Sequence, residues 1–203
     1  MKKNKISKEW IKRQRRDIYV RKSKQDGFRS RAVYKLQEIN EKHKILKNGY
    51  LVIDLGAAPG SWSQYLSDKV KKGKILAIDV LKFDPIKNIH IIQGDFTDQK
   101  YQKKIADFFE NKVDLIISDM AVNTSGNKNL DSIVTGELCL EAMNFSINHL
   151  SEKGIFLSKI FMGSSFNEIM SSGKKSFKEL KVFKPPSSRK DSKESFIICK
   201  YLK

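Results

Sequence analysis

Hydrophobic residues in this chain gather in short continuous runs, which alternate with segments where they recur every three or four positions. The runs lack the polar alternation of a half-exposed strand, so each predicts a strand buried on both faces. We expect strands at residues 50–53, 74–80, 89–93, 113–118, 154–161 and 196–202, and helices at 29–40, 60–70, 101–109 and about 135–150. The alternation predicts an α/β fold with a doubly wound, mostly parallel sheet and helices on both faces.

Length and composition predict one globular domain. The chain has 203 residues, 39% of them hydrophobic and 31% charged, which is too apolar for a disordered chain. No apolar run approaches the roughly 18 residues of a membrane span, and the N-terminus lacks a signal-peptide core. Cys139 and Cys199 have neither metal-ligand spacing nor disulfide density, so we expect buried free thiols and a cytoplasmic protein.

The positive charge is concentrated at the two ends of the chain. The net charge is +17, with +11 in residues 1–35, +7 in residues 173–203 and −1 between them. Such clustering is typical of a protein that binds a polyanion, because Lys and Arg release counterions when they contact phosphates. The plain alternative is that basic ends only keep the protein soluble. We expect a single domain over residues 1–203, with a basic N-terminal arm at about 1–28.

A turn of small residues, Asp54-Leu55-Gly56-Ala57-Ala58-Pro59-Gly60, follows the first predicted strand. Doubly wound sheets bind ligands at this edge, and glycine lets a ligand approach the backbone closely. The G-x-x-x-G spacing differs from the dinucleotide pattern, and no P-loop pattern occurs. The plain interpretation of this segment is an ordinary tight turn. It also resembles the first motif of S-adenosylmethionine-dependent methyltransferases, where this turn holds the amino-acid end of the cofactor.

Two acidic residues stand at the ends of the next predicted strands. Asp79 is placed where a carboxylate accepts hydrogen bonds from the ribose hydroxyls of a bound nucleoside. Asp95, followed by Phe96, is placed where a carboxylate accepts from an adenine amino group while Phe96 or a neighbour packs on the ring. Each alone is also explained as a helix cap or a solvated loop acid. Together with the turn, they favour an adenosine-containing cofactor.

Ser118-Asp119-Met120-Ala121 follows the fourth predicted strand. Methyltransferases that act on amino groups usually carry Asn or Asp followed by Pro-Pro and an aromatic residue here. Enzymes that methylate cytosine C5 need a nucleophilic cysteine near this strand, and neither Cys139 nor Cys199 is so placed. The remaining chemical groups at strand ends and beside the sheet are Lys35, Asp119, Lys159 and Glu194. Paired surface charges are their plain interpretation.

This ordered Lys-Asp-Lys-Glu set resembles the FtsJ-like ribose 2′-O-methyltransferases. The resemblance also includes Arg29-Ser30-Arg31-Ala32-Val33-Tyr34-Lys35-Leu36 and Pro186-Ser187-Ser188-Arg189, and covers about residues 10–202. It implies a Rossmann-like methyltransferase fold with a seven-stranded sheet. It also implies a catalytic tetrad of Lys35, Asp119, Lys159 and Glu194, and cofactor contacts from Gly60, Trp62, Asp79, Asp95 and Asp119.

The resemblance implies a substrate as well: a uridine ribose of 23S rRNA in the assembled large subunit. Aligning the ribose 2′-oxygen with the sulfonium methyl is worth about 7 to 11 kcal/mol, and a general base adds roughly 10²- to 10⁴-fold. We expect Lys159 to be that base. We expect a monomer without metal or membrane partner. A tRNA ribose methyltransferase and a non-catalytic ribosome-assembly factor that binds RNA are the alternatives.

Two positions depart from the family pattern. Ser61 stands where a second glycine is usual, and Val122 where proline usually follows Met-Ala. The first puts a small side chain against the cofactor turn, and the second changes the loop that carries Asp119. The polar segment 123–126 is predicted to be a mobile loop, with a substrate-contacting flap as the alternative.

Overall fold

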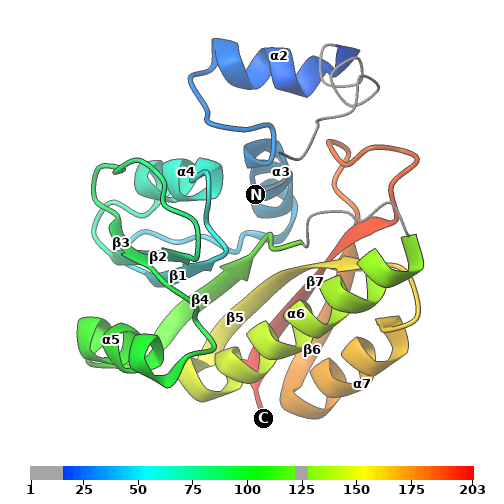
Figure 1. The fold of residues 1–203 in the computed structure, drawn as a ribbon. Helices are drawn as coiled ribbons and strands as arrows, with labels where there is room; N and C mark the ends of the chain where they lie inside the picture. Colours follow the sequence, from blue (N-terminus) through cyan, green and yellow to red (C-terminus); the bar gives the residue numbers. More distant parts are fainter. Residues whose placement is uncertain (1–15, 122–127) are drawn as a thin grey trace, which may run out of the picture.

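The protein folds around one seven-stranded sheet with the order β3-β2-β1-β4-β5-β7-β6 (Figure 1). The computed structural model describes residues 16–121 and 128–203, with side chains from residue 132 onward in the second range. The strands are β1 (Leu51–Leu55), β2 (Lys74–Asp79), β3 (His90–Gln93), β4 (Val113–Ser118), β5 (Leu150–Phe161), β6 (Phe177–Phe183) and β7 (Glu194–Leu202). The helices are α2 (Ile18–Gln25), α3 (Val33–His43), α4 (Ser61–Lys69), α5 (Gln99–Phe109), α6 (Lys128–His149) and α7 (Phe166–Ser176).

Strands β1 to β5 run parallel, and β7 lies antiparallel between β5 and β6. The strand order reverses at β1, which pairs with both β2 and β4. A crevice beyond the carboxyl ends of β1 and β4 is therefore where this topology places a ligand. The predicted α/β fold with a mostly parallel sheet is confirmed.

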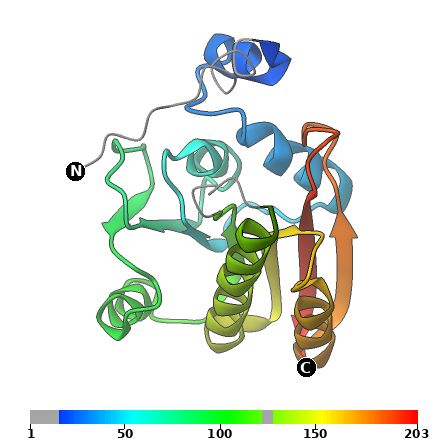
Figure 2. The same cartoon turned by 45° about the vertical axis from the view of Figure 1, so that its right-hand side comes forward.

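Helices cover both faces of the sheet (Figure 2). On one face, α5, α6 and α7 pack through residues such as Phe109, Phe145 and Ile169. On the other face, α3 and α4 pack through residues such as Leu36 and Leu66. Because both faces are covered, the central strands are buried on both sides, which explains their continuous hydrophobic sequences.

Several elements differ from the pattern-based expectation. The first strand was expected to stop at Asp54, but β1 continues through Asp54 and Leu55, and Asp54 is buried. The pattern did not predict α2, α7 or β6. Edge strand β6 buries only Phe177, and α7 buries only Ile169 and Gly173. Such elements carry little hydrophobic signal, because one side of each faces solvent.

Part of the expected basic N-terminal arm forms helix α2, which Asp17 caps by accepting a hydrogen bond from the Tyr19 N–H at 3.1 Å. The Tyr19 and Tyr34 rings lie 5.3 Å apart, and Lys22 Nζ lies 4.8 Å from the centre of the Tyr34 ring. These contacts attach α2 to α3. Residues 1–15 of the expected arm lie outside the described residues.

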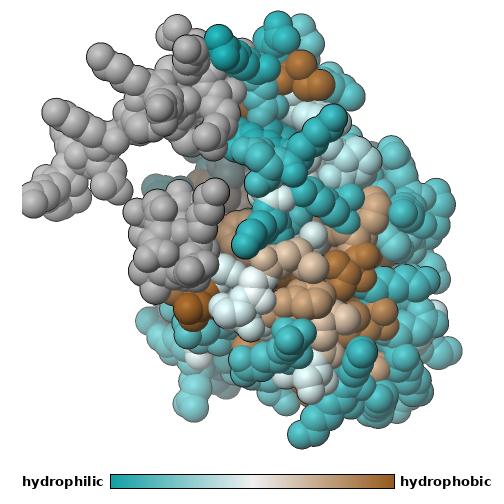
Figure 3. Space-filling model, turned by 90° about the vertical axis from the view of Figure 1, so that its right-hand side faces the viewer, coloured by the Kyte–Doolittle hydropathy of each residue, from teal (hydrophilic) through white to brown (hydrophobic). Residues whose placement is uncertain are grey.

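On the face shown in Figure 3, hydrophilic side chains surround a central area of more hydrophobic ones. None of the helices in the described ranges has the length and hydropathy of a membrane span. Cys139 and Cys199 are buried free thiols, as predicted.

Candidate active site

Strand register brings the predicted site residues to one edge of the sheet. Leu55 pairs with Ile78 on one side and with Ser118 on the other, and Ser118 pairs with Ser158. The next residues along these strands are Gly56, Asp79, Asp119 and Lys159. Four functional candidates from distant parts of the sequence therefore occupy one row at the carboxyl edge.

The cofactor turn is a tight backbone cradle beside this row. Gly56 and Gly60 have positive φ angles of 69° and 98°, a conformation that glycine adopts without a steric penalty. A Cβ atom on Gly56 would lie 2.0 Å from Met120 Cγ, and one on Gly60 would lie 2.7 Å from Ile86 Cδ1. Both positions therefore require glycine. Gly60 is the N-cap of α4, whose first amides have no partner within the helix.

The two acidic residues at the neighbouring strand ends accept hydrogen bonds from different parts of the chain. Asp79 Oδ2 accepts a hydrogen bond from the Ala58 N–H at 2.8 Å, and Oδ1 accepts from the Leu81 N–H at 2.7 Å. Asp79 is thus fixed against the cofactor turn, with lone pairs left for a ligand. Asp95 is exposed, and its Oδ1 accepts from the amide and hydroxyl of Thr97 at 2.9 and 2.8 Å.

Asp54 is a buried carboxyl group under the cradle. Its Oδ2 accepts a hydrogen bond from the Ser63 hydroxyl at 2.6 Å. Burial raises the pKa of Asp54 to about 7; the carboxylates of Asp119 and Asp79 add to the rise, and the Ser63 hydrogen bond opposes it. Asp54 thus joins the end of β1 to α4 beneath the turn.

Two aromatic side chains that the sequence associated with the cofactor lie inside the core. The Trp62 indole is 3% exposed, donates to the Ala32 carbonyl at 2.8 Å and lies 5.8 Å from the Phe196 ring. Phe96 is buried and packs edge-on against Phe145 of α6 at 5.6 Å. The Phe96 ring therefore packs in the core and does not face the cofactor site. Trp62 can contact the cofactor only through its backbone at the start of α4.

Lys35, Asp119, Lys159 and Glu194 form one connected cluster. Lys159 Nζ lies 3.0 Å from Asp119 Oδ1 and donates to the Asp119 carbonyl at 2.5 Å. Lys35 Nζ lies 3.6 Å from Asp119 Oδ2 and donates to Glu194 Oε2 at 2.7 Å. Their side chains are between 7% and 17% exposed. Each lysine charge is therefore balanced by a carboxylate in a largely buried site.

The electrostatics of the cluster favour charged Asp119 and Lys35. Burial pushes the pKa of Lys35 down, but Asp119 and Glu194 together outweigh it, so the pKa of Lys35 is raised. Burial pushes the pKa of Asp119 up, but the charges of Lys159 and Lys35 outweigh it, so the pKa of Asp119 is lowered. Lys35 is thus held protonated between two carboxylates.

The loop before β7 positions Glu194. The Ser188 hydroxyl donates to Glu194 Oε1 at 2.7 Å, and the Glu194 amide donates to Ser192 Oγ at 3.1 Å. The same loop is tied to the N-terminal region through Asp17, which accepts from Arg189 Nη2 at 3.1 Å and pairs with Arg31. Sequence reasoning assigned no role to Ser188 or Asp17. Ser188 lies in the Pro186–Arg189 motif, which was the available signal.

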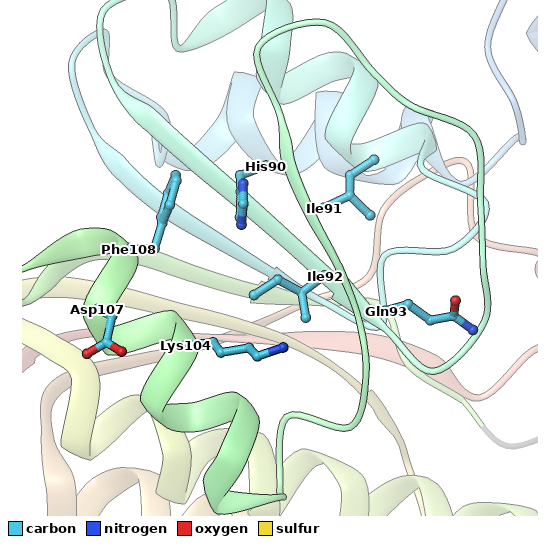
Figure 4. Close-up of a pocket in the computed structure, with 7 residues that line it drawn as sticks. All are labelled: His90, Ile91, Ile92, Gln93, Lys104, Asp107 and Phe108. Atoms are coloured by element: carbon cyan, nitrogen blue, oxygen red, sulfur yellow. The ribbon is translucent and has the colours of Figure 1, made fainter.

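A separate pocket lies away from this cluster. It has a volume of about 570 Å³ between β3 and α5 and is lined by His90, Ile91, Ile92, Gln93, Lys104, Asp107 and Phe108 (Figure 4). At one end the His90 and Phe108 rings stack at 4.5 Å. No residue of the cofactor cradle or of the charged cluster lines this pocket, so we assign it no part in the chemistry.

The segment 123–126 and Val122 lie outside the described residues.

Comparison with known proteins gives the class. The family model of FtsJ-like methyltransferases matches residues 28–202. The chain belongs to this family, and it is an S-adenosylmethionine-dependent methyltransferase. The resemblance seen in the sequence is therefore confirmed, together with the fold and cofactor that it implied.

Individual relatives agree with this class. The chain is 63% identical over its full length, and over the full length of the relative, to "Ribosomal RNA large subunit methyltransferase E" of Pelagibacter ubique. It is 43% identical to the protein of that name in Rickettsia bellii, over 95% of this chain and 88% of the relative. Among solved structures, a ribosomal RNA methyltransferase of Plasmodium falciparum matches with a TM-score of 0.78 and 33% identity, over 86% of this chain and 98% of the other.

Proposed function

We propose that this methyltransferase transfers a methyl group to the 2′-oxygen of a uridine ribose in 23S rRNA, presented in the assembled large subunit. The observation that carries the reaction type is the buried Lys35-Asp119-Lys159-Glu194 cluster beside the cofactor cradle. The substrate is supported by the names of the full-length relatives and by the family resemblance. A cytoplasmic monomer is the form in which we expect the protein to act.

The cradle fits S-adenosylmethionine. Gly56 and Gly60 permit the positive φ angles of the tight turn that follows β1, and the N-terminal amides of α4, including that of Trp62, suit a carboxylate. Asp79 would accept from the ribose hydroxyls of the cofactor, and Asp95 from its adenine amino group. Asp119 would contact the methyl-bearing end. When bound, the cofactor supplies the methyl group, whose bond to sulfur breaks as the bond to the ribose oxygen forms, with the electron pair left on sulfur.

Lys159 is the proton acceptor in this proposal. Lys159 is a cation in the resting cluster, so it must release its proton to the solvent before it can accept one from the substrate. The neutral amine has two N–H donors and one lone pair, and the carboxylate and carbonyl of Asp119 provide two acceptors beside Lys159 Nζ. The lone pair then remains for the proton of the ribose 2′-hydroxyl. Lys35 is less suited to this role, because its pKa is raised by Asp119 and Glu194. General base catalysis of this kind typically contributes about 10²- to 10⁴-fold.

Lys35 and Glu194 would hold the ribose. Their 2.7 Å contact fixes a donor and an acceptor next to Asp119. A ribose hydroxyl both donates and accepts hydrogen bonds, so this pair is suited to orient it. Correct orientation is the larger contribution to the rate, because bringing the 2′-oxygen into line with the methyl group replaces a costly bimolecular encounter.

Two basic segments flank the site on the side where the parallel strands end (Figure 1). Helix α2 presents exposed Arg21, Lys22 and Lys24, and the loop between β6 and β7 presents exposed Lys190 and Lys193. These residues would contact RNA phosphates, which position a substrate without specifying its sequence. They support a structured RNA as the partner.

Methyl transfer from labelled S-adenosylmethionine tests the proposal. Unmodified 50S subunits, naked 23S rRNA and bulk tRNA are incubated in parallel, digested to nucleosides and analysed for label. We expect label in 2′-O-methyluridine from 50S subunits. Label only in tRNA would identify the alternative substrate, and label on a base would contradict the role of the cluster. No label on any RNA, with cofactor binding intact, would favour the non-catalytic assembly factor.

A further inference from the structure

The segment between α2 and α3, residues 27–32, is attached to helix α4. Gln64 of α4 accepts a hydrogen bond from the Arg29 N–H at 2.8 Å and donates to the Gly27 carbonyl at 3.2 Å. The Ser30 and Ser61 hydroxyls lie 2.8 Å apart. This segment therefore has a fixed position beside the first turn of α4, which begins directly after the cofactor cradle.

The Arg29 side chain extends from this segment to two loops of the cofactor site. Its Nη1 donates to the Pro59 carbonyl at 2.9 Å and to the Asp84 carbonyl at 2.8 Å. Its Nη2 donates to the Pro85 carbonyl at 2.9 Å. Pro59 belongs to the cradle, and Asp84 and Pro85 belong to the loop after Asp79. One guanidinium group thus connects the two loops between which Asp79 lies.

The partners of Arg29 are unusual for a residue in a basic segment. In the part of the chain that the structure describes, Arg29 pairs with no carboxylate, and the hydrogen bonds of its guanidinium group go to backbone carbonyls. A Cβ atom on Gly60 would lie 2.8 Å from Arg29 Nη1, so the guanidinium is packed directly against the cradle. Hydrogen bonds from a charged donor are stronger than neutral ones, and the planar fork of arginine reaches several acceptors at once.

We infer that Arg29 is a positioning residue for the cofactor, which holds the cradle and the loop after Asp79 at the separation that S-adenosylmethionine requires. This inference rests on the proposed cofactor contacts of Asp79 and Gly60. It assigns Arg29 a different role from the exposed cations of α2, which would contact RNA, although all of them lie in the same basic stretch of sequence. Loss of Arg29 would leave three carbonyls without their donor and free the two loops to move apart.

The test measures cofactor and RNA binding separately. Calorimetry with S-adenosylmethionine is performed on the wild-type protein and on Arg29→Ala, Arg29→Lys and the control Arg21→Ala, and thermal unfolding establishes that each variant is folded. We expect Arg29→Ala to weaken cofactor binding by about tenfold to a hundredfold, the equivalent of losing one charge-assisted hydrogen bond. The cofactor affinity of Arg29→Lys should lie between those of the wild type and Arg29→Ala, because lysine keeps the positive charge but lacks the planar guanidinium group. Arg21→Ala should bind the cofactor as the wild type does.

RNA binding supplies the opposite readout. We expect Arg29→Ala to retain the wild-type dependence of RNA affinity on salt. In Arg21→Ala, the slope of log affinity against log salt concentration should decrease by about one, the equivalent of one lost phosphate contact. An Arg29→Ala protein with wild-type cofactor affinity would overturn the inference, whether or not its RNA binding changed. Because these measurements need no methyl transfer, the inference can fail while the proposed reaction holds, and the reaction can fail while Arg29 still positions the cofactor.

Discussion

Lys35 Nζ lies 2.7 Å from Glu194 Oε2, although the two residues are 159 positions apart in the sequence. The contact brings the first turn of α3 to the start of β7, next to the Asp119–Lys159 pair. Because all four charges are largely buried, each depends on the others for compensation. The cluster is therefore a structural unit as well as the proposed centre of the reaction.

Removal of Glu194 should destabilise the fold. Glu194→Ala leaves two lysines facing one carboxylate, and breaking a buried ion pair costs on the order of 3 kcal/mol. Urea unfolding at neutral pH measures the change in the free energy of unfolding. Lys74→Ala is the matched control, because Lys74 and Glu110 form an exposed pair at 4.0 Å, for which we expect less than about 1 kcal/mol. Equal losses in the two variants would show that the cluster is not coupled as described.

Ser188 should affect the rate more than the affinity for the cofactor. Ser188→Ala removes the hydroxyl that donates to Glu194 Oε1, so Glu194 is held less firmly against Lys35. We expect kcat to fall by about tenfold, the equivalent of one hydrogen bond to a charged group. The KM for S-adenosylmethionine should not change. Ser187→Ala is the control, since Ser187 bonds to Glu38 instead, and a similar loss of kcat in it would argue against a specific role for Ser188.

Asp54 should make stability depend on pH. Its pKa is about 7 in the folded protein, against an ordinary value of 3.8, so the folded state binds the proton more tightly than the unfolded state does. The stabilisation is complete below about pH 4 and is lost as the pH rises toward 7. Three pH units correspond to on the order of 4 kcal/mol. Asp54→Asn mimics the neutral acid and removes this dependence.

Urea unfolding of the wild type and Asp54→Asn at several pH values between 4 and 8 measures this difference. The variant should gain stability relative to the wild type as the pH rises through this window. The lowered pKa of Asp119 has the opposite effect, in that its contribution is lost as the pH falls, but this loss occurs at the acid end of the window and below it, where Asp54 is neutral in the wild type as well. Parallel stability curves would show that Asp54 is not a buried acid with a raised pKa.

The sequence predicted the row of strand ends well, because a strand buried on both faces leaves a continuous hydrophobic run and its carboxyl end is visible as the next polar residue. Asp119 was located in this way, directly after the predicted strand 113–118, whereas Asp79 and Lys159 lie within the last residues of the predicted strands 74–80 and 154–161. Val113–Ser118 was predicted with the observed bounds. The connection between Lys35, Asp119 and Glu194 came from the family resemblance, since no local pattern reports which distant charges meet.

Other parts of the site had no such signal. Asp54 has an ionisable side chain, so the hydrophobic pattern placed it after the end of the predicted strand 50–53. In the structure it is buried inside β1, where its carboxyl group accepts a hydrogen bond from Ser63. Arg29 was counted as one basic residue among many, and its carbonyl partners come from loops 30 and 55 positions away. Trp62 and Phe96 show the converse case, in which core packing uses an aromatic side chain that the sequence associated with a ligand.

Replacement of Lys159 tests the central claim, that this cluster performs the methylation with Lys159 as the proton acceptor. Lys159→Met keeps the length of the side chain, and Asp119 keeps Lys35 as a neighbouring cation. Single-turnover methylation of 50S subunits is measured together with cofactor binding. We predict a fall of about 10²- to 10⁴-fold in the formation of 2′-O-methyluridine, with unchanged affinity for S-adenosylmethionine. A variant that binds the cofactor normally and methylates at nearly the wild-type rate would contradict the account.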